Sequence, residues 1–356
     1  MKWSFKVGSI LGIPIKVHVT FLFLLIFIAL IGGDLAKGLY GVLFVILVFF
    51  CVILHELSHS LVAIHYGHKV RSITLLPIGG MAQMDDIPED SKQEILISIA
   101  GPIASLAISG ILSFILYMTK VPISWLDSES FFEGNMMLNL FWINILLAGF
   151  NIIPAFPMDG GRVLRGVLGI FMDHMKATRI AVFIGQVFAV ILFFLGIFYN
   201  WWLALIAVFI YLGAEGEERM WALRYALSDA KVAAVMLKDF ISFSPNDTLL
   251  RASEIFLHAL QNDFPVLFGD RLVGILKREA IIKGINEGKE NERIADLMER
   301  EFLTTTEKRP LVALYKQMTE SGVGMVPVIR DDNLVGIVTM EQIGRYHMVS
   351  TARGAK

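Results

Sequence analysis

Long apolar runs fill the first 214 residues of this chain and constrain its fold more than any other feature. A helix that crosses a bilayer needs about 20 mostly apolar residues. Runs near that length occupy residues 19–31, 40–64, 95–118, 136–153, 180–199 and 201–213. The first is long enough only if Ile15 to Val17 join it, and the last is short. We therefore predict a polytopic α-helical membrane protein with about six transmembrane helices, in a domain covering residues 1–215.

The composition agrees with a membrane protein and excludes some alternatives. Hydrophobic residues make up 55% of the chain and charged residues 18%, whereas soluble domains average about 45–50% and about 25%. Cys51 is the only cysteine, so no disulfide can form within the chain. The net charge of −2 provides no general basic patch, and we expect no nucleic-acid partner.

The basic residues of the short loops predict the orientation, because cytoplasmic loops carry an excess of Lys and Arg. With six helices and the N-terminus inside, ten basic residues fall on the cytoplasmic side and two on the outer side. The inner set is Lys2, Lys6, Lys16, Lys69, Arg71, Lys92, Arg162, Arg165, Lys176 and Arg179, and the outer set is Lys37 and Lys120. We therefore predict a multi-pass protein of the cell membrane, with its N-terminus and its C-terminal part in the cytoplasm.

The second apolar run contains the polar cluster His-Glu-Leu-Ser-His at 55–59. On a helix, residues i and i+4 share one face, so His55 and His59 can hold one metal ion while Glu56 acts on a water molecule beside it. Titratable groups inside a membrane helix are costly and mark function. The cluster predicts a metal-dependent hydrolase, with a satisfied polar cluster or a proton relay as the alternative.

A third metal ligand is needed, because catalytic zinc takes three protein ligands and keeps one position open. The candidate is Asp159, in a stretch rich in proline and glycine that follows the fourth apolar run. In the predicted orientation His55 lies roughly 22 Å along the second run, at about 1.5 Å per residue. Asp159 follows the inner end of the fourth run. Both positions are then near the cytoplasmic side, and we expect them to meet, with the carboxylate on irregular backbone.

Nearby amides and glycines are candidates for substrate contacts. The Asn151 amide can stabilise an oxyanion, whereas Asn144, on the same helical face, serves either that role or helix–helix packing. Residues 70–84 predict a hairpin or re-entrant loop that contains Gly79 and Gly80. An exposed strand edge there would align an unfolded substrate by strand addition. The alternative is an ordinary connecting hairpin.

After residue 215 charged residues return, and the sequence repeats itself. Phe-Pro-Val at 264–266 aligns with Val-Pro-Val at 326–328, and Leu-Val-Gly-Ile at 272–275 aligns with the same letters at 334–337, always offset by 62 residues. Each copy predicts a short strand, a helix, two strands across a turn and a second helix. The repeat resembles a tandem pair of cystathionine-beta-synthase (CBS) domains. We assign a linker to 216–230 and CBS domains to 231–290 and 291–350, a soluble α/β pair.

Many CBS pairs bind adenine nucleotides between the copies, and the resemblance raises that function here. The family's pattern Gly-x-x-Thr-x-x-Asp ends in Gln342 in the second copy and in Ala280 in the first. The resemblance therefore leaves two roles open, an adenine-nucleotide site and a structural or dimerising module. CBS pairs often associate, which implies a homodimer.

The membrane part resembles the site-2 protease family of intramembrane metalloproteases, peptidase family M50. The matching motifs are His-Glu-x-x-His at 55–59, Pro-Ile-Gly-Gly at 77–80, Ala-Gly-Pro at 100–102 and Phe-Asn-x-x-Pro-Ala-Phe-Pro-Met-Asp-Gly-Gly-Arg at 150–162. The resemblance implies zinc ligands His55, His59 and Asp159, the acid/base Glu56, and Asn151 near the scissile carbonyl. It also implies regulated intramembrane proteolysis, in a prokaryotic membrane, of a protein such as an anti-sigma factor or a membrane-tethered regulator.

A CBS-regulated membrane transporter or channel is the alternative function. Discontinuous helices and charges within the membrane suit transport as well. Transport does not require His-Glu-x-x-His together with a distant carboxylate, and hydrolysis is therefore the primary prediction.

Overall fold

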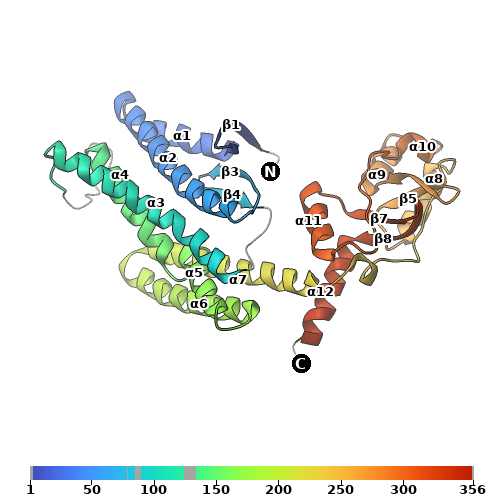
Figure 1. The fold of residues 1–356 in the computed structure, drawn as a ribbon. Helices are drawn as coiled ribbons and strands as arrows, with labels where there is room; N and C mark the ends of the chain where they lie inside the picture. Colours follow the sequence, from blue (N-terminus) through green and yellow to red (C-terminus); the bar gives the residue numbers. More distant parts are fainter. Residues whose placement is uncertain (1–2, 78, 85–89, 124–133, 355–356) are drawn as a thin grey trace. The chain divides into compact units, whose positions relative to one another are not determined.

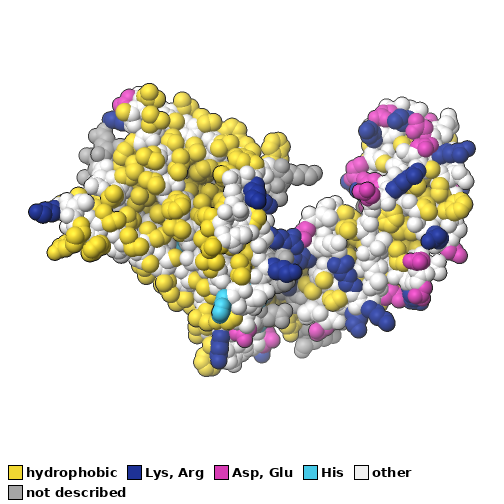
Figure 2. All heavy atoms as spheres, turned by 45° about the horizontal axis from the view of Figure 1, so that its top comes forward, with side chains coloured by type: hydrophobic (Ala, Val, Ile, Leu, Met, Phe, Trp, Pro, Cys, Tyr) yellow, Lys and Arg dark blue, Asp and Glu magenta, His cyan; other side chains and the backbone are white. Residues whose placement is uncertain are grey.

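The computed structural model describes residues 3–77, 79–84, 90–123 and 134–354 (Figure 1). The chain divides into two compact units, Met1–Arg219 and Met220–Lys356. Hydrophobic side chains cover most of the visible surface of the first unit, whereas charged side chains gather on the second (Figure 2). A surface so rich in exposed apolar side chains suits contact with lipid.

The helices of the first unit agree with most of the predicted apolar runs. They are α1 (Val19–Ile31), α2 (Leu35–His65), α3 (Ser91–Met118), α4 (Met136–Ile152), α5 (Asp159–Gly169), α6 (His174–Tyr199) and α7 (Trp201–Ser228). Among the described helices, three are long and apolar enough to cross a membrane, namely α2, α3 and α6, while α1 and α4 are shorter apolar helices. The number of six transmembrane helices stays a prediction.

Helix α7 is longer than the apolar run that predicted it. Its first half is residues 201–213, and its second half carries charged residues from Glu215 onward. The segment predicted as a linker, 216–230, is thus helical as far as Ser228. Helix α7 belongs to the first unit up to Arg219 and to the second unit beyond it.

Side-chain caps mark the N-terminal ends of four helices of the first unit, at or shortly before the start of each apolar run. Asp34 accepts a hydrogen bond from the backbone N–H of Lys37 at the start of α2. Asp90 does the same for α3, and Asn135 and Asp173 cap α4 and α6. Such caps satisfy N–H groups that have no partner within the helix.

A four-stranded sheet in the first unit has the strand order β1-β2-β3-β4. Its strands are β1 (Ser4–Ile10), β2 (Ile13–His18), β3 (Val70–Leu76) and β4 (Gly79–Met84). The first two and the last two are antiparallel hairpins, and β2 runs parallel to β3. The predicted hairpin within 70–84 is confirmed, and β4 is one of the two edge strands, with β1 at the other edge.

The sheet packs against α2, and this packing decides whether Ile15 to Val17 lengthen the first apolar run. Ile13, Ile15 and Ile73 form a buried cluster with Leu57 of α2. Alternate residues of β2 face this core, as expected for a half-buried strand. The residues Ile15 to Val17 therefore belong to a strand and do not lengthen the first membrane helix.

The second unit contains both repeat copies around one four-stranded sheet, in the order β5-β6-β8-β7. Its elements are the 3-10 helix η2 (Val232–Ala234), α8 (Leu249–His258), β5 (Phe264–Phe268), β6 (Arg271–Leu276), α9 (Arg278–Asn286), α10 (Ile294–Leu297), α11 (Leu311–Ser321), β7 (Met325–Arg330), β8 (Asn333–Thr339) and α12 (Met340–Gly354). The predicted turns are confirmed, because Gly269, Asp331 and Asp332 have positive φ angles between the paired strands. The predicted first strand of each copy is reduced to isolated bridges.

Helix α8 offers a matched test of the core of the first copy. Leu249 is fully buried against residues of β5 and β6, whereas Leu257, on the same helix, is 77% exposed. We expect Leu249→Ala to destabilise the second unit by about 2–5 kcal/mol through the cavity it leaves. Leu257→Ala should have little effect. Protease resistance of the full chain across a urea series measures both, and equal effects would contradict the assigned core.

Candidate metal centre

Helix α2 presents two histidines to the interior of the first unit. His55 and His59 lie one turn apart, and only 3% and 6% of their surfaces are exposed. Their rings meet edge to face, with the centroids 4.8 Å apart. The spacing of four residues places both Nε2 atoms on one face, where they are 3.1 Å apart.

Helix α3 orients both imidazoles. Nδ1 of His59 lies 2.6 Å from the carbonyl oxygen of Ile97. A carbonyl only accepts hydrogen bonds, so Nδ1 donates, and in the neutral ring Nε2 then carries a lone pair. Nδ1 of His55 lies 2.9 Å from the hydroxyl of Ser105. Such partners fix the ring orientation of metal-binding histidines.

The Asp159 carboxylate completes the cluster. Its Oδ2 lies 3.2 Å from Nε2 of His55 and 3.1 Å from Nε2 of His59. The expectation that Asp159 stands on irregular backbone is corrected, because it is the first residue of α5 and the irregular segment precedes it. A carboxylate in the first turn interacts favourably with the helix dipole.

The three ligand atoms fit a zinc ion. They form a nearly equilateral triangle with edges of 3.1–3.2 Å, close to the edge of about 3.3 Å that tetrahedral zinc with bonds of about 2.0–2.1 Å requires. The lone pair of His59 Nε2 and the Asp159 carboxylate oxygen repel unless a proton or a metal ion lies between them. The donor set thus has the geometry and the charge of a metal site.

Gly101 of α3 leaves the space that such an ion needs. A Cβ atom at this position would stand 2.5 Å from Nε2 of His55 and closer still to Nε2 of His59. It would therefore intrude on the space beside both Nε2 atoms, where a metal ion bound to them would lie. Sequence reasoning missed the roles of Gly101, Ser105 and the Ile97 carbonyl, although the Ala-Gly-Pro motif at 100–102 marked this part of α3.

Glu56 lies against the edge strand β4. Its Oε2 accepts a hydrogen bond from the backbone N–H of Ala82, at 3.2 Å. A Cβ on Gly80 would stand 2.8 Å from Cγ of Glu56, so the close approach requires glycine there. Gly79, the first residue of β4, has a φ of 140°, which an L side chain rarely adopts.

The two predicted asparagines lie on α4 and bond to their own helix. Nδ2 of Asn151 donates to the carbonyl of Leu147 at 2.9 Å. Nδ2 of Asn144 donates to the carbonyl of Leu140 at 2.8 Å, and Asn144 is fully buried. Their predicted roles at the site stay predictions.

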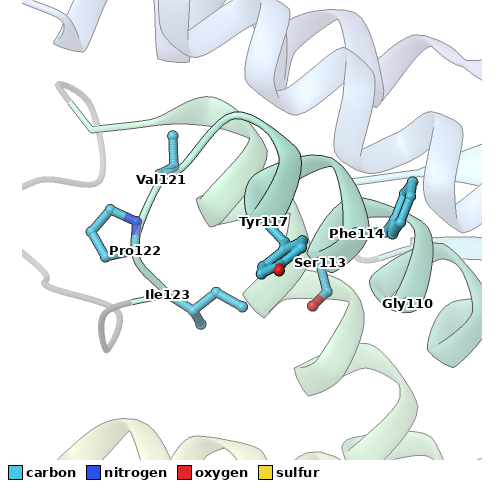
Figure 3. A pocket seen from close by; sticks show the side chains of 7 residues that line it. All are labelled: Gly110, Ser113, Phe114, Tyr117, Val121, Pro122 and Ile123. Carbon is cyan, nitrogen blue, oxygen red and sulfur yellow. The ribbon is translucent and has the colours of Figure 1, made fainter.

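Two hollows lie along α3. One of about 270 Å³ has mainly apolar walls from α3, the end of α4 and α5, and Asp159 borders it. Another of about 530 Å³ lies at the far end of α3, where Ser113, Tyr117 and Ile123 are among its lining residues (Figure 3). The second hollow does not include a residue of the metal cluster.

The acidic position that ends the nucleotide-binding pattern of other CBS pairs carries Gln342 in the second copy. Gln342 accepts hydrogen bonds from the backbone N–H of Thr339 at 2.9 Å and from its hydroxyl at 2.5 Å. In the first copy the counterpart of Gln342 is Ala280, and Lys277, the counterpart of Thr339, forms an ion pair of 2.6 Å with Glu299. Both side chains are engaged within the chain.

Fold and site together define a membrane-embedded metallohydrolase, and comparisons with known proteins agree. The model of peptidase family M50 matches residues 43–128 and 122–195, and the CBS domain model matches 232–287 and 294–347. The zinc metalloprotease MJ0392 of Methanocaldococcus jannaschii is 33% identical over 348 residues, covering 97% of this chain and 96% of the relative. Stage IV sporulation protein FB of Bacillus subtilis is 26% identical over 172 residues, covering 48% and 54%.

A solved structure of the site-2 protease from Methanocaldococcus jannaschii has 38% sequence identity, covers 61% of this chain and 96% of its own, and gives a TM-score of 0.44. The identity over nearly the whole of MJ0392 shows that this chain belongs to peptidase family M50. It is a zinc metalloprotease with a C-terminal CBS pair. This membership favours the hydrolase over the transporter that the sequence left as an alternative.

Replacing Gly101 tests the metal centre without changing any ligand. We expect Gly101→Ala to abolish zinc binding, because the added methyl group occupies the place of the ion. Gly110→Ala on the same helix is the control, since a Cβ there meets nothing within 4 Å. Elemental analysis of purified protein should find about one zinc per chain in the control. A full zinc content in Gly101→Ala would refute the assigned position.

Proposed function

We propose that this protein cleaves peptide bonds of membrane-spanning protein substrates, as an intramembrane zinc metalloprotease. The observation that carries the proposal is the convergence of His55, His59 and Asp159, with Glu56 next to the first ligand on the same helix. The setting on apolar helices supports cleavage within or beside the bilayer, because polar clusters are costly there and are kept for function.

The roles of the side chains follow from their chemistry. His55, His59 and Asp159 would hold one zinc ion, which when bound acts as a Lewis acid toward water and the substrate carbonyl. Glu56 accepts a proton from the attacking water as the new C–O bond forms. It then donates this proton to the amide nitrogen as the C–N bond breaks. No other acid or base is needed to balance the reaction.

We assign Asn151 to the developing oxyanion, with Asn144 as a weaker candidate. An amide N–H that strengthens its hydrogen bond as negative charge develops lowers the barrier. Asn151 now donates to the Leu147 carbonyl, so it must turn away from its own helix to serve the substrate.

Substrate presentation is assigned to the outer edge of β4. A helical substrate must unwind locally, because its carbonyls are otherwise held in backbone hydrogen bonds. An extended segment can pair with an edge strand, and the contact between Ala82 and Glu56 brings that edge to the catalytic carboxylate. Gly79 and Gly80 leave the first two positions of β4 without side chains. Single-pass regulators, such as anti-sigma factors or membrane-tethered transcription factors, have the required form.

The predicted orientation completes this proposal. We assign a multi-pass topology with the N-terminus and the CBS pair in the cytoplasm, on the basis of the Lys and Arg distribution. The segment with His55 and His59 and the segment with Asp159 would then both lie near the cytoplasmic side of the membrane.

For the CBS pair we infer a structural module that associates into a homodimer, and we do not assign adenine-nucleotide binding. Gln342 and Lys277 already bond to neighbours within the chain. We therefore expect no heat of binding when ATP is titrated into the full-length protein in detergent. Saturable binding at micromolar ATP would overturn this inference and assign a sensor role to the pair.

Glu56→Gln separates catalysis from metal binding. The variant keeps the shape of the side chain but cannot accept the proton, so cleavage should fall by about 10²–10⁴-fold while the zinc content is unchanged. The measurement uses purified full-length protein and a model membrane-spanning substrate, with a chelator-treated sample as reference. Undiminished cleavage by Glu56→Gln would rule out the hydrolytic role of this residue.

A further inference from the structure

We propose that Glu217 of α7 and Arg165 of α5 are positioning residues for the third metal ligand. Their ion pair holds α5 in the place where the Asp159 carboxylate meets the two imidazoles. The inference rests on the proposed function for the identity of the ligands. It goes beyond that function by assigning a role to a charged cluster outside the site.

Arg165 is the centre of this cluster. It is 1% exposed and is among the largest fully buried side chains of the described chain. Its Nη1 donates to Oε1 of Glu217 at 3.0 Å. Its Nε donates to Oε1 of Glu94 on α3 at 2.7 Å, and Nη2 bonds to the same oxygen. A buried guanidinium between two carboxylates fixes three helices, because removal of one partner leaves an uncompensated buried charge.

The position of Arg165 in the sequence makes the cluster relevant to the metal. Asp159 is the first residue of α5, and Arg165 follows six residues later in the same helix. At about 1.5 Å per residue the two lie roughly 9 Å apart along a rigid helix. A shift of α5 at Arg165 therefore moves the carboxylate. Only Asp159 among the three ligands depends on α5, because both histidines are on α2.

Helix α7 packs along the whole segment that carries Asp159. Gly213 lies so close to Pro157 that a Cβ would stand 2.7 Å from its Cδ. Ala214 is buried beside Phe156, and Ile210 is buried beside Ala155 and Met158. Glu217 follows Gly213 by one turn. One face of α7 therefore contacts the chain on both sides of the ligand, before it through Gly213 and after it through Glu217.

The guanidinium also faces the segment in front of Asp159. Its Cζ lies 5.1 Å from the centroid of the Phe156 ring, within the range of a cation–π contact. On the other side, Glu94 precedes Ile97 by three residues on α3, and the Ile97 carbonyl orients His59. Arg165 thus connects α5, which carries Asp159, to α3, which orients the imidazole of His59.

Zinc affinity of the purified full-length protein tests the proposal. Loss of a group that hydrogen-bonds a metal ligand weakens metal binding about 10- to 100-fold. Glu217 acts one step further out, through Arg165, so we expect a loss of about tenfold for Glu217→Ala. Glu217→Gln keeps an acceptor for Arg165 and should fall between this variant and the wild type. The matched control is Glu215→Ala, two residues earlier on α7, where Glu215 pairs with the exposed Arg219. The control should bind zinc as the wild type does.

A double-mutant cycle separates positioning from general stability. If Glu217 acts through Asp159, then Glu217→Ala has no further effect on zinc affinity once Asp159→Ala has removed that ligand, to within about twofold. A merely structural role would weaken zinc binding in both backgrounds. Equal losses in both backgrounds, or wild-type affinity in Glu217→Ala, would overturn the proposal.

The same measurements distinguish failure of this inference from failure of the proposed function. Asp159→Ala with wild-type zinc affinity would overturn the ligand set and the positioning role together. Weak zinc binding by Asp159→Ala with unchanged binding by Glu217→Ala would overturn the positioning role alone. Protease resistance of each variant shows whether it is folded.

Discussion

The convergence of three electron-rich atoms on one point is the constraint on which the membrane unit depends. Two imidazole nitrogens and a carboxylate oxygen lie 3.1–3.2 Å from one another in a buried setting. A cation bound to all three atoms would join α2 to α5. The packing of α3 keeps these three atoms in place. Helix α3 contacts the Nδ1 atoms of both rings through Ser105 and the Ile97 carbonyl, and Gly101 of the same helix leaves space beside their Nε2 atoms.

Small residues allow the backbone segments to come this close. Besides Gly101, both glycines that follow Asp159 lie against backbone. A Cβ on Gly160 would overlap the carbonyls of Ile152 and Ile153, and one on Gly161 would stand 2.7 Å from Phe156 N. The start of α5 is thus pressed onto the end of α4. A side chain at these positions would push the carboxylate away from the imidazoles, so the close approach of the three candidate ligand atoms requires both glycines.

Features encoded in local pattern could be predicted from the sequence, whereas features that depend on packing mostly could not. The helices over the apolar runs, the hairpin within 70–84 and the CBS repeat are confirmed. Each could be predicted because it has a strong periodic or turn signal in the sequence. The strand β2 was not predicted, although apolar residues alternate from Ile13 to Val17. The segment directly precedes the apolar run 19–31, which hides the alternation. The charged second half of α7 gave no apolar signal. The roles of Ser105 and Arg165 depend on contacts over 50 and 52 residues, which no local pattern encodes.

The parallel pairing of β2 with β3 sets the order in which this protein can be completed during synthesis. Ile15 pairs with Ile73, and α1 and α2 lie between them in the chain. Both helices must therefore be made before the sheet can close. A growing chain that ends near residue 65 already holds both imidazoles and Glu56, but it lacks the strand beside Glu56 and the carboxylate of α5. The cluster of His55, His59 and Asp159 therefore stays incomplete in the growing chain until α5 has been synthesised.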